Sequence, residues 1–171
     1  IPDERLYKLA ELYKTDKIVP ATVTFVDIAG LVAGASQGEG LGNQFLSHIR
    51  TCNAICQVVR AFKDDNVVHV DNEHSVKKDI ETINTELVLA DLQAVQNYMP
   101  KLEKEVKANP KLKIKLDILN QVKQLLNDNI PLFGAEDIDF EQIKDLQLIT
   151  TKPIIYVFNV DEAGLNDEVH K

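Results

Sequence analysis

The chain has 171 residues, of which 44% are apolar and 27% charged, and it carries a formal net charge of −8 at pH 7. This composition is typical of a soluble globular protein with one good core, and no apolar run approaches membrane length. The start of the chain is no signal peptide, and Cys52 and Cys56 are interpreted as incidental thiols, so we expect a reduced cytoplasmic protein. The acidic balance argues against wholesale nucleic-acid binding but is compatible with a local basic patch.

The first third of the chain predicts alternating helices and strands. Asp3 is suited to cap a short helix whose apolar residues share one face. The β-branched run Thr22–Asp27 predicts a strand. Leu41–Cys52 predicts a helix because large apolar residues recur every four positions, and the nearly continuous apolar run Ala54–Phe62 predicts a buried parallel strand.

Residues 75–129 predict two long helices. The first has apolar residues at alternating spacings of three and four, a coiled-coil-like seam of Ile80, Ile83, Leu87, Ala90, Ala94, Tyr98, Leu102 and Val106. Pro100 lies inside this seam, and we expect it to kink or restart the helix. After a turn at Asn109-Pro110, a second apolar stripe is placed to pack antiparallel on the first: Leu112, Leu116, Leu119, Val122 and Leu126.

The last third returns to mixed structure. Ile130–Gly134 predicts a loop, Asp137–Asp145 a short helix and Pro153–Phe158 a strand. Strand–helix alternation on both sides of a helical hairpin predicts an α/β nucleotide-binding fold that carries an inserted, antiparallel α-helical hairpin arm.

A glycine-rich stretch follows the run that ends at Asp27. Five of the seven glycines of the chain lie between Gly30 and Gly42. An apolar strand that delivers a carboxylate, followed at once by glycine, suits a phosphate–magnesium site, because the carboxylate reaches the metal shell and the glycine N–H approaches a phosphate. The alternative is a strand that ends in a solvated aspartate and a flexible loop.

The residue identities in this stretch are more specific than the spacing of its aspartate and glycines. FVDIAGLVAGAS at residues 25–36 and GEGLGN at 38–43 closely resemble the YchF/Obg-like ATPase family of P-loop NTPases. Three later stretches agree, and the resemblance covers essentially the whole chain: DDNVVHV at 64–70, DIETINTEL at 79–87 and NVDE at 159–162. The resemblance implies a Ras-like domain that binds and hydrolyses ATP with Mg²⁺ and associates with ribosomes.

The resemblance also implies roles for residues beside the phosphates. Asp27 would act through the Mg²⁺ shell by way of water, Gly30 would contact the γ-phosphate through its N–H, and residues 34–42 would be the moving switch II. Leu31 stands where Ras-like proteins place a catalytic glutamine, and a leucine cannot orient water, so the water-orienting group is unknown. Gln57 stands where family members often carry a histidine, so the resemblance assigns no catalytic histidine to this chain.

Asn159-Val160-Asp161-Glu162 follows the last predicted strand, where GTPases carry Asn-Lys-x-Asp. Val160 replaces the lysine and Glu162 the aspartate, so guanine loses its bidentate partner, and with it several kcal/mol of preference. The resemblance therefore implies a preference for ATP over GTP, with Asn159, Val160 and Glu162 at the base. The alternative is a strand that ends in an ordinary polar turn.

No Gly-x-x-x-x-Gly-Lys-Ser/Thr motif occurs in the chain. The family carries this phosphate loop upstream and a TGS domain downstream, so the resemblance implies a fragment of a longer ATPase. We divide it into residues 1–66, a partial NTPase domain with switch II, 67–148, the inserted arm, and 149–171, the return to the NTPase domain. We expect a monomeric parent with no membrane association, and an inactive isolated fragment.

The predicted turn between the long helices is basic. Residues 101–115 hold six lysines and two glutamates, a net of +4 in an acidic chain. Lys101–Lys115 is thus a candidate for ribosome or RNA contact. The alternative is a solvated helix end, since no aromatic lies in the cluster to stack on bases. A rival function for the chain is a non-catalytic binding module whose arm docks on a protein or RNA partner.

Overall fold

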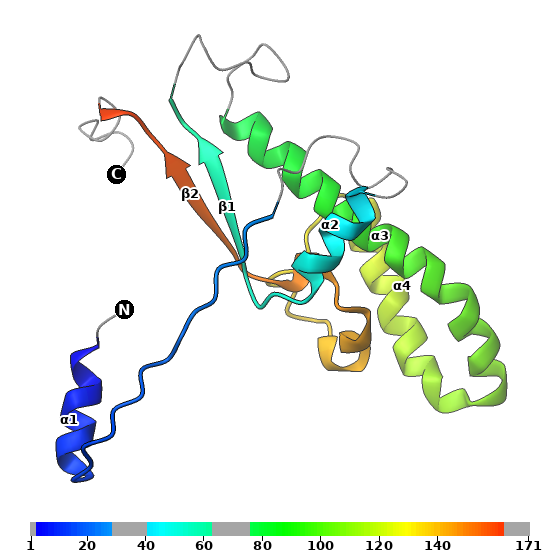
Figure 1. Cartoon of the computed structure of the whole chain (residues 1–171). Coiled ribbons are helices and arrows are strands. Elements are labelled where there is room, and N and C mark those ends of the chain that lie inside the picture. Colours follow the sequence, from blue (N-terminus) through cyan, green and yellow to red (C-terminus); the bar gives the residue numbers. More distant parts are fainter. Residues whose placement is uncertain (1–2, 29–40, 63–75, 163–171) are drawn as a thin grey trace.

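The computed structural model describes residues 3–28, 41–62 and 76–162 (Figure 1). Its α-helices are α1 (Glu4–Leu12), α2 (Leu41–Arg50), α3 (Val76–Ala108) and α4 (Lys113–Asn127). The 3₁₀ helices are η1 (Pro110–Leu112), η2 (Phe140–Leu146) and η3 (Ile149–Thr151), and the strands are β1 (Ile55–Arg60) and β2 (Ile154–Asn159). The order of helices and strands along the described residues therefore follows the sequence-based prediction, with differences taken up below.

Strands β1 and β2 pair in parallel. Ile55 lies opposite Ile154, and Arg60 lies opposite Asn159. The ladder begins with a hydrogen bond from the Ile55 N–H to the Pro153 carbonyl at 2.9 Å. Both arrows in Figure 1 point the same way, so the two carboxyl ends lie at one edge. Strand β1 is less buried than its apolar run predicts: Val59 is buried, but Val58 is 67% exposed.

The strand predicted at Thr22–Asp27 is wrong for this structure. The segment is extended but has no strand pairing, and Phe25 is 82% exposed. A strand needs a neighbour to satisfy its N–H and C=O groups. Among the described residues β1 and β2 pair only with each other, so β-propensity alone leaves this segment unpaired.

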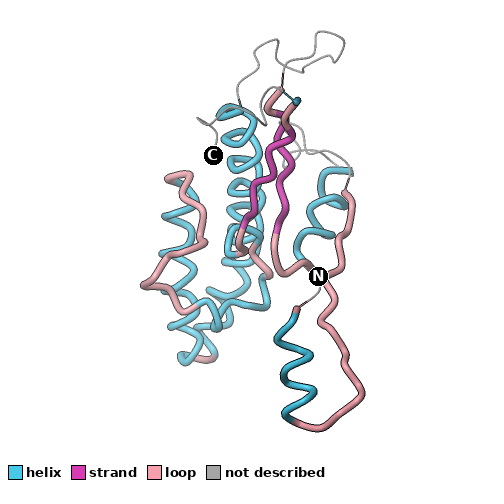
Figure 2. The backbone as a smooth tube through the Cα atoms, turned by 90° about the vertical axis from the view of Figure 1, so that its left-hand side faces the viewer, coloured by secondary structure: helices cyan, strands magenta, loops and turns pink. Residues whose placement is uncertain are grey.

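Helix α1 forms as the sequence predicts. The Asp3 side chain caps it by accepting a hydrogen bond from the Arg5 N–H at 3.0 Å. No residue of α1 is buried, and its apolar face is open to solvent at Leu12, which is 73% exposed. Figures 1 and 2 show α1 standing away from the other elements at the end of the extended segment.

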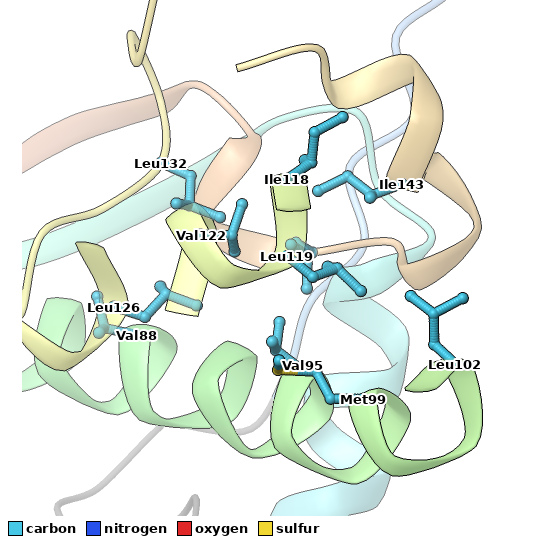
Figure 3. Close-up of a cluster of buried hydrophobic side chains, with 11 residues drawn as sticks. Val88, Val95, Met99, Leu102, Ile118, Leu119, Val122, Leu126, Leu132 and Ile143 are labelled. Atoms are coloured by element: carbon cyan, nitrogen blue, oxygen red, sulfur yellow. The ribbon is translucent and has the colours of Figure 1, made fainter. Parts of the chain in front are cut away.

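Helices α3 and α4 pack side by side around the larger core (Figure 3). Its buried residues are Val88, Val95, Met99, Leu102, Ile118, Leu119, Val122, Leu126, Leu132, Ile143 and Leu148. The stripe predicted for α4 is confirmed, since its last three members are buried. The seam predicted for α3 is displaced, because Ala94, Tyr98 and Val106 are only partly buried.

Pro100 does not restart the helix, because α3 is one uninterrupted element from Val76 to Ala108. Proline removes the N–H that would bond to the carbonyl of Gln96. Pro100 and Gln96 are both exposed, so the orphaned carbonyl lies on the water-facing side of the helix. The turn to α4 is capped by Asn109, whose side chain accepts from the Lys111 N–H at 3.3 Å.

The short helix predicted at Asp137–Asp145 forms later and tighter, as the 3₁₀ helix η2. It ends at Gln147, which adopts the left-handed conformation at φ 47°. A second, smaller core then joins the ends of several elements: Leu46, Ile49, Leu87, Ala90 and Ile149 are buried, with Ile28, Ile55, Ile83 and Ile154 packed against them. This core holds α2, α3 and η3 together at the amino ends of β1 and β2.

Candidate functional site

The carboxyl ends of β1 and β2 form the first part of the candidate site. Arg60 and Asn159 are the last residues of their strands and lie opposite each other, and the Ala61 N–H bonds to the Asn159 carbonyl at 2.8 Å. Asn159 and Glu162 are exposed, and Val160 is half-buried. In open α/β sheets, ligands bind at this edge of the strands. The four-residue motif at the end of β2 is thus at a position where a ligand can reach it.

Asp27 belongs to the exposed segment that precedes Ile28, and Ile28 packs against the smaller core. Among the described residues, no hydrogen bond joins Asp27 to Asn159. Gly30 and Leu31 lie outside the described residues, as do most of the glycine-rich stretch and residues 64–70. Their predicted roles stay predictions.

Gln57 and Asn84 place polar side chains between the strands and α3. The Asn84 amide donates to the Tyr156 hydroxyl at 3.4 Å, and Tyr156 lies opposite Gln57 in the ladder. The Gln57 Oε1 atom is buried without a hydrogen-bond partner among the described residues. Arg60, which lies 5.4 Å from the Phe62 ring, is a cation at the strand end that sequence reasoning did not single out.

A second constellation lies at the opposite ends of the strands, around the Asp91 carboxylate of α3. Asp91 is fully buried. It accepts hydrogen bonds from the Ile149 N–H at 2.9 Å, the Thr150 N–H at 2.7 Å and the Thr150 hydroxyl at 2.9 Å. Arg50, the last residue of α2, donates to the same carboxylate at 3.1 Å. We call these residues, Arg50, Asp91, Ile149 and Thr150, the Asp91 junction.

Burial and the neighbouring donors act on the pKa of the Asp91 carboxyl in opposite directions. Burial raises the pKa of the Asp91 carboxyl, and the hydrogen bonds from Thr150 and Ile149 and the charge of Arg50 offset part of that rise. Arg50 also donates to the Gln147 carbonyl at 3.0 Å and the Ala90 carbonyl at 3.4 Å. The Arg50 guanidinium at the end of α2 therefore contacts both α3 and the segment before η3.

The basic cluster lies at the far end of the α3–α4 pair. Lys104, Lys107, Lys111 and Lys113 are exposed. Lys115 differs, because it forms an ion pair with Asp145 at 2.7 Å and lies 5.0 Å from the centre of the Tyr98 ring. Burial lowers the pKa of Lys115, but the hydrogen bonds to Asp145 and Tyr98 outweigh it, so the pKa lies above its usual value. Lys115 is held against Asp145 and Tyr98, so its charge is less available to a binding partner than the charges of the exposed lysines.

Three further features bear on function. Within the described ranges, no group of three or more histidine, cysteine, aspartate or glutamate side chains gathers to hold a metal by protein ligands alone. Among the same residues, no helix has the length and apolar character needed to cross a membrane. Cys52 and Cys56 are free thiols.

Comparison with known proteins agrees with this geometry. A family model described as a 50S ribosome-binding GTPase matches residues 10–91. The "Ribosome-binding ATPase YchF" of Bacillus subtilis is 46% identical over 170 residues, which is 98% of this chain and 46% of that protein. The chain is a homologue of the YchF proteins. A protein of the same name from Mycoplasma pneumoniae is 45% identical over 170 residues, covering 98% of this chain and 47% of the relative.

A solved YchF structure extends the comparison to three dimensions. The structure of the Schizosaccharomyces pombe YchF GTPase matches with a TM-score of 0.74 and 39% identity, over 96% of this chain and 46% of that one. The P-loop GTPase-like fold predicted from the sequence is thereby confirmed, with its parallel strands and helices. The chain spans about half the length of these YchF relatives. The bacterial proteins are named ATPases, whereas the yeast protein is named a GTPase.

Proposed function

We propose that the intact protein is a cytoplasmic, ribosome-associated P-loop NTPase that binds and hydrolyses ATP with Mg²⁺. The observation that carries this proposal is the homology to ribosome-binding ATPases over nearly the whole chain. The position of Asn159 at the carboxyl end of the parallel strands supports it, because this edge is where α/β folds bind ligands.

Asp27 is the residue proposed to act on the metal, by way of water. Its carboxylate is exposed and supplies the hard oxygen that Mg²⁺ prefers. Mg²⁺ sites in phosphate-transfer proteins use one or two carboxylates together with waters and substrate phosphates, so one aspartate fits this chemistry. The metal would neutralise charge on the phosphates; Gly30 would donate its N–H to the γ-phosphate, and Leu31 would leave water orientation to another group.

Asn159, Val160 and Glu162 are the proposed base-reading residues. Val160 offers no alkyl ammonium stem to cover the base, and Glu162 is one methylene longer than the aspartate of GTPases. We expect the backbone and Asn159 to read the adenine edge, so ATP is preferred to GTP.

The helix pair α3–α4 is the proposed ribosome-binding arm, inserted between the two parts of the NTPase domain. We keep the division into residues 1–66, 67–148 and 149–171. The exposed lysines at the end of the pair supply the positive charge that rRNA phosphates attract. We expect the intact protein to act as a monomer.

A second function is proposed for residues 1–171 by themselves. Their sequence contains no phosphate-binding glycine loop of the Walker type. The helix pair has its own core and an exposed basic end. We expect these residues alone to bind a protein or RNA partner without hydrolysing ATP.

Magnesium-dependent ATP binding by the intact protein tests the main proposal. Asp27→Asn should weaken Mg·ATP binding or hydrolysis about 10- to 100-fold, the usual effect of losing a residue that acts on a metal through its outer shell. Asp16→Asn is the matched control, because Asp16 is exposed on the same N-terminal segment and has no proposed role. If wild type shows neither ATP binding nor hydrolysis, the proposed function is wrong.

A further inference from the structure

The Asp91 junction joins three parts of the chain that are distant in sequence. Asp91 belongs to α3, Arg50 ends α2, and Ile149 and Thr150 form the turn that precedes β2. Among the described residues, the Asp91 carboxylate has four polar contacts, and all of them go to the other two parts. A buried carboxylate satisfied in this way holds its partners in one geometry, because any shift leaves a buried group unpaired.

Open hollows border Arg50 on two sides of this junction. An open hollow of about 230 Å³ lies between α2 and α3, lined by Leu46, Ser47, Arg50, Ala90, Gln93, Ala94 and Asn97. A second open hollow, of about 380 Å³, lies between the end of α2 and the segment before β2, and its lining includes Arg50, Gln147, Leu148 and Thr151. Close-packed contacts resist displacement, whereas a hollow leaves room for it. The end of α2 at Arg50 therefore borders open space, whereas Leu46 and Ile49 of the same helix are buried against α3. Arg50 is the polar tie between this end of α2, α3 and the segment before β2.

Arg50 also reaches the segment that leads into β2. It donates to the Gln147 carbonyl at 3.0 Å. Cys52 follows Arg50 by two residues, and its carbonyl accepts a hydrogen bond from Lys152 Nζ at 2.6 Å. The segment that leads from α2 into β1 is thus bonded to the segment before β2 in both directions, by Arg50 and by Lys152. Displacement of α2 at Arg50 would act on the turn before β2 as well as on α3.

We propose that Arg50 is a positioning residue that couples nucleotide binding to α3 and to the start of β2 through Asp91. This inference rests on the proposed function, since α2 begins directly after the stretch assigned to the phosphates. A helix transmits displacement along its length, and Arg50 stands at its last turn. The coupling connects the nucleotide to the helix pair that carries the basic end.

The backbone N–H groups of Ile149 and Thr150 are the direct reporters of the junction. Both are bonded to Asp91, so their hydrogen exchange requires the junction to open. The experiment measures their exchange in the intact protein with and without Mg and a non-hydrolysable ATP analogue, alongside calorimetry of the same ligand. In wild type we expect the ligand to change the exchange rate by roughly fivefold or more, the lower range of coupling between sites.

Arg50→Met removes the tie and should abolish this response while the analogue still binds. Arg50→Lys keeps the charge with fewer donors and should restore part of it, and it carries the test if the methionine variant does not fold. Asp117→Asn is the matched control, because Asp117 is exposed on α4, and it should leave the response intact.

Two results overturn the coupling while leaving the proposed function standing. One is a wild-type protein that binds the analogue with no change at Ile149 and Thr150, and the other is an arginine variant that responds as wild type does. Absence of any binding heat in wild type overturns the proposed function and this inference with it.

Discussion

Thr150 gives two hydrogen bonds to Asp91, one from its backbone N–H at 2.7 Å and one from its hydroxyl at 2.9 Å. The acceptor is an aspartate of α3, 59 positions earlier in the chain, and both residues are buried. This contact fixes the turn before β2 on the helix pair. Because the Asp91 carboxylate has no access to water, the stability of the folded protein depends on keeping every donor to this carboxylate.

Asp91→Ala should therefore destabilise the intact protein strongly. The change leaves the Arg50 charge and two backbone N–H groups without their acceptor, and breaking a buried charged pair costs about 3–5 kcal/mol. Thr150→Val keeps the shape and removes one hydroxyl bond, so about 1 kcal/mol is expected. Urea unfolding measures both. Asp117→Ala, on the exposed face of α4, is the control and should stay within about 0.5 kcal/mol.

The α3–α4 interface gives a second stability prediction. Leu119 is fully buried between the helices (Figure 3), and Leu119→Ala should cost about 2–5 kcal/mol of unfolding free energy, because it opens a cavity. Ile114, five residues earlier on α4, is 64% exposed, and Ile114→Ala should be nearly neutral. Equal effects at the two positions would mean that the helices do not share this core in solution.

The sequence predicted most elements of the fold, and its errors have physical causes. Helices α3 and α4 and strands β1 and β2 were predicted because their apolar periodicity or continuity is strong. Thr22–Asp27 has the same β-branched character but lacks a neighbouring strand among the described residues. Sequence period indicates which face of a segment is apolar, whereas pairing depends on what lies beside it.

The candidate site was predicted unevenly. Asn159 and its neighbours were found from a motif, and the structure places them at the end of β2. The Asp91 junction was missed, although Leu87, Asp91 and Val95 follow one another at helical spacing on an apolar face. An aspartate on such a face was the available signal. Its partners Arg50 and Thr150 are too distant in sequence for spacing to connect them.

The strand pair gives a prediction about residues 1–171 alone. Ile155 is 59% and Phe158 51% exposed, and a two-stranded sheet with uncovered apolar faces is marginal in water. We expect this polypeptide to be unstable, domain-swapped or aggregated in its α/β part, while the helices between residues 76 and 127 keep their amide protection. Hydrogen exchange resolves the two parts. Cooperative unfolding with protected amides in both strands would contradict the prediction.

The basic end of the helix pair gives a prediction about partner binding. Replacing Lys104, Lys107, Lys111 and Lys113 with Glu in the intact protein should weaken ribosome or RNA binding and flatten its dependence on salt, because fewer counterions are released. ATP hydrolysis without the partner should be unaffected. Lys77→Glu, an exposed lysine at the other end of α3, is the single-site control. An unchanged salt slope would mean that these lysines are only a solvated surface.

Calorimetry of ATP and GTP binding to the intact protein tests the central claim most directly. Adenine presents a donor and an acceptor where guanine presents two donors, so a carboxylate aimed at the guanine edge repels adenine. With Val160 and Glu162 in place, ATP should bind more tightly than GTP, and Val160→Lys combined with Glu162→Asp should move the ratio towards GTP. A wild-type preference for GTP, or a ratio that the double change leaves untouched, would contradict this account of the site.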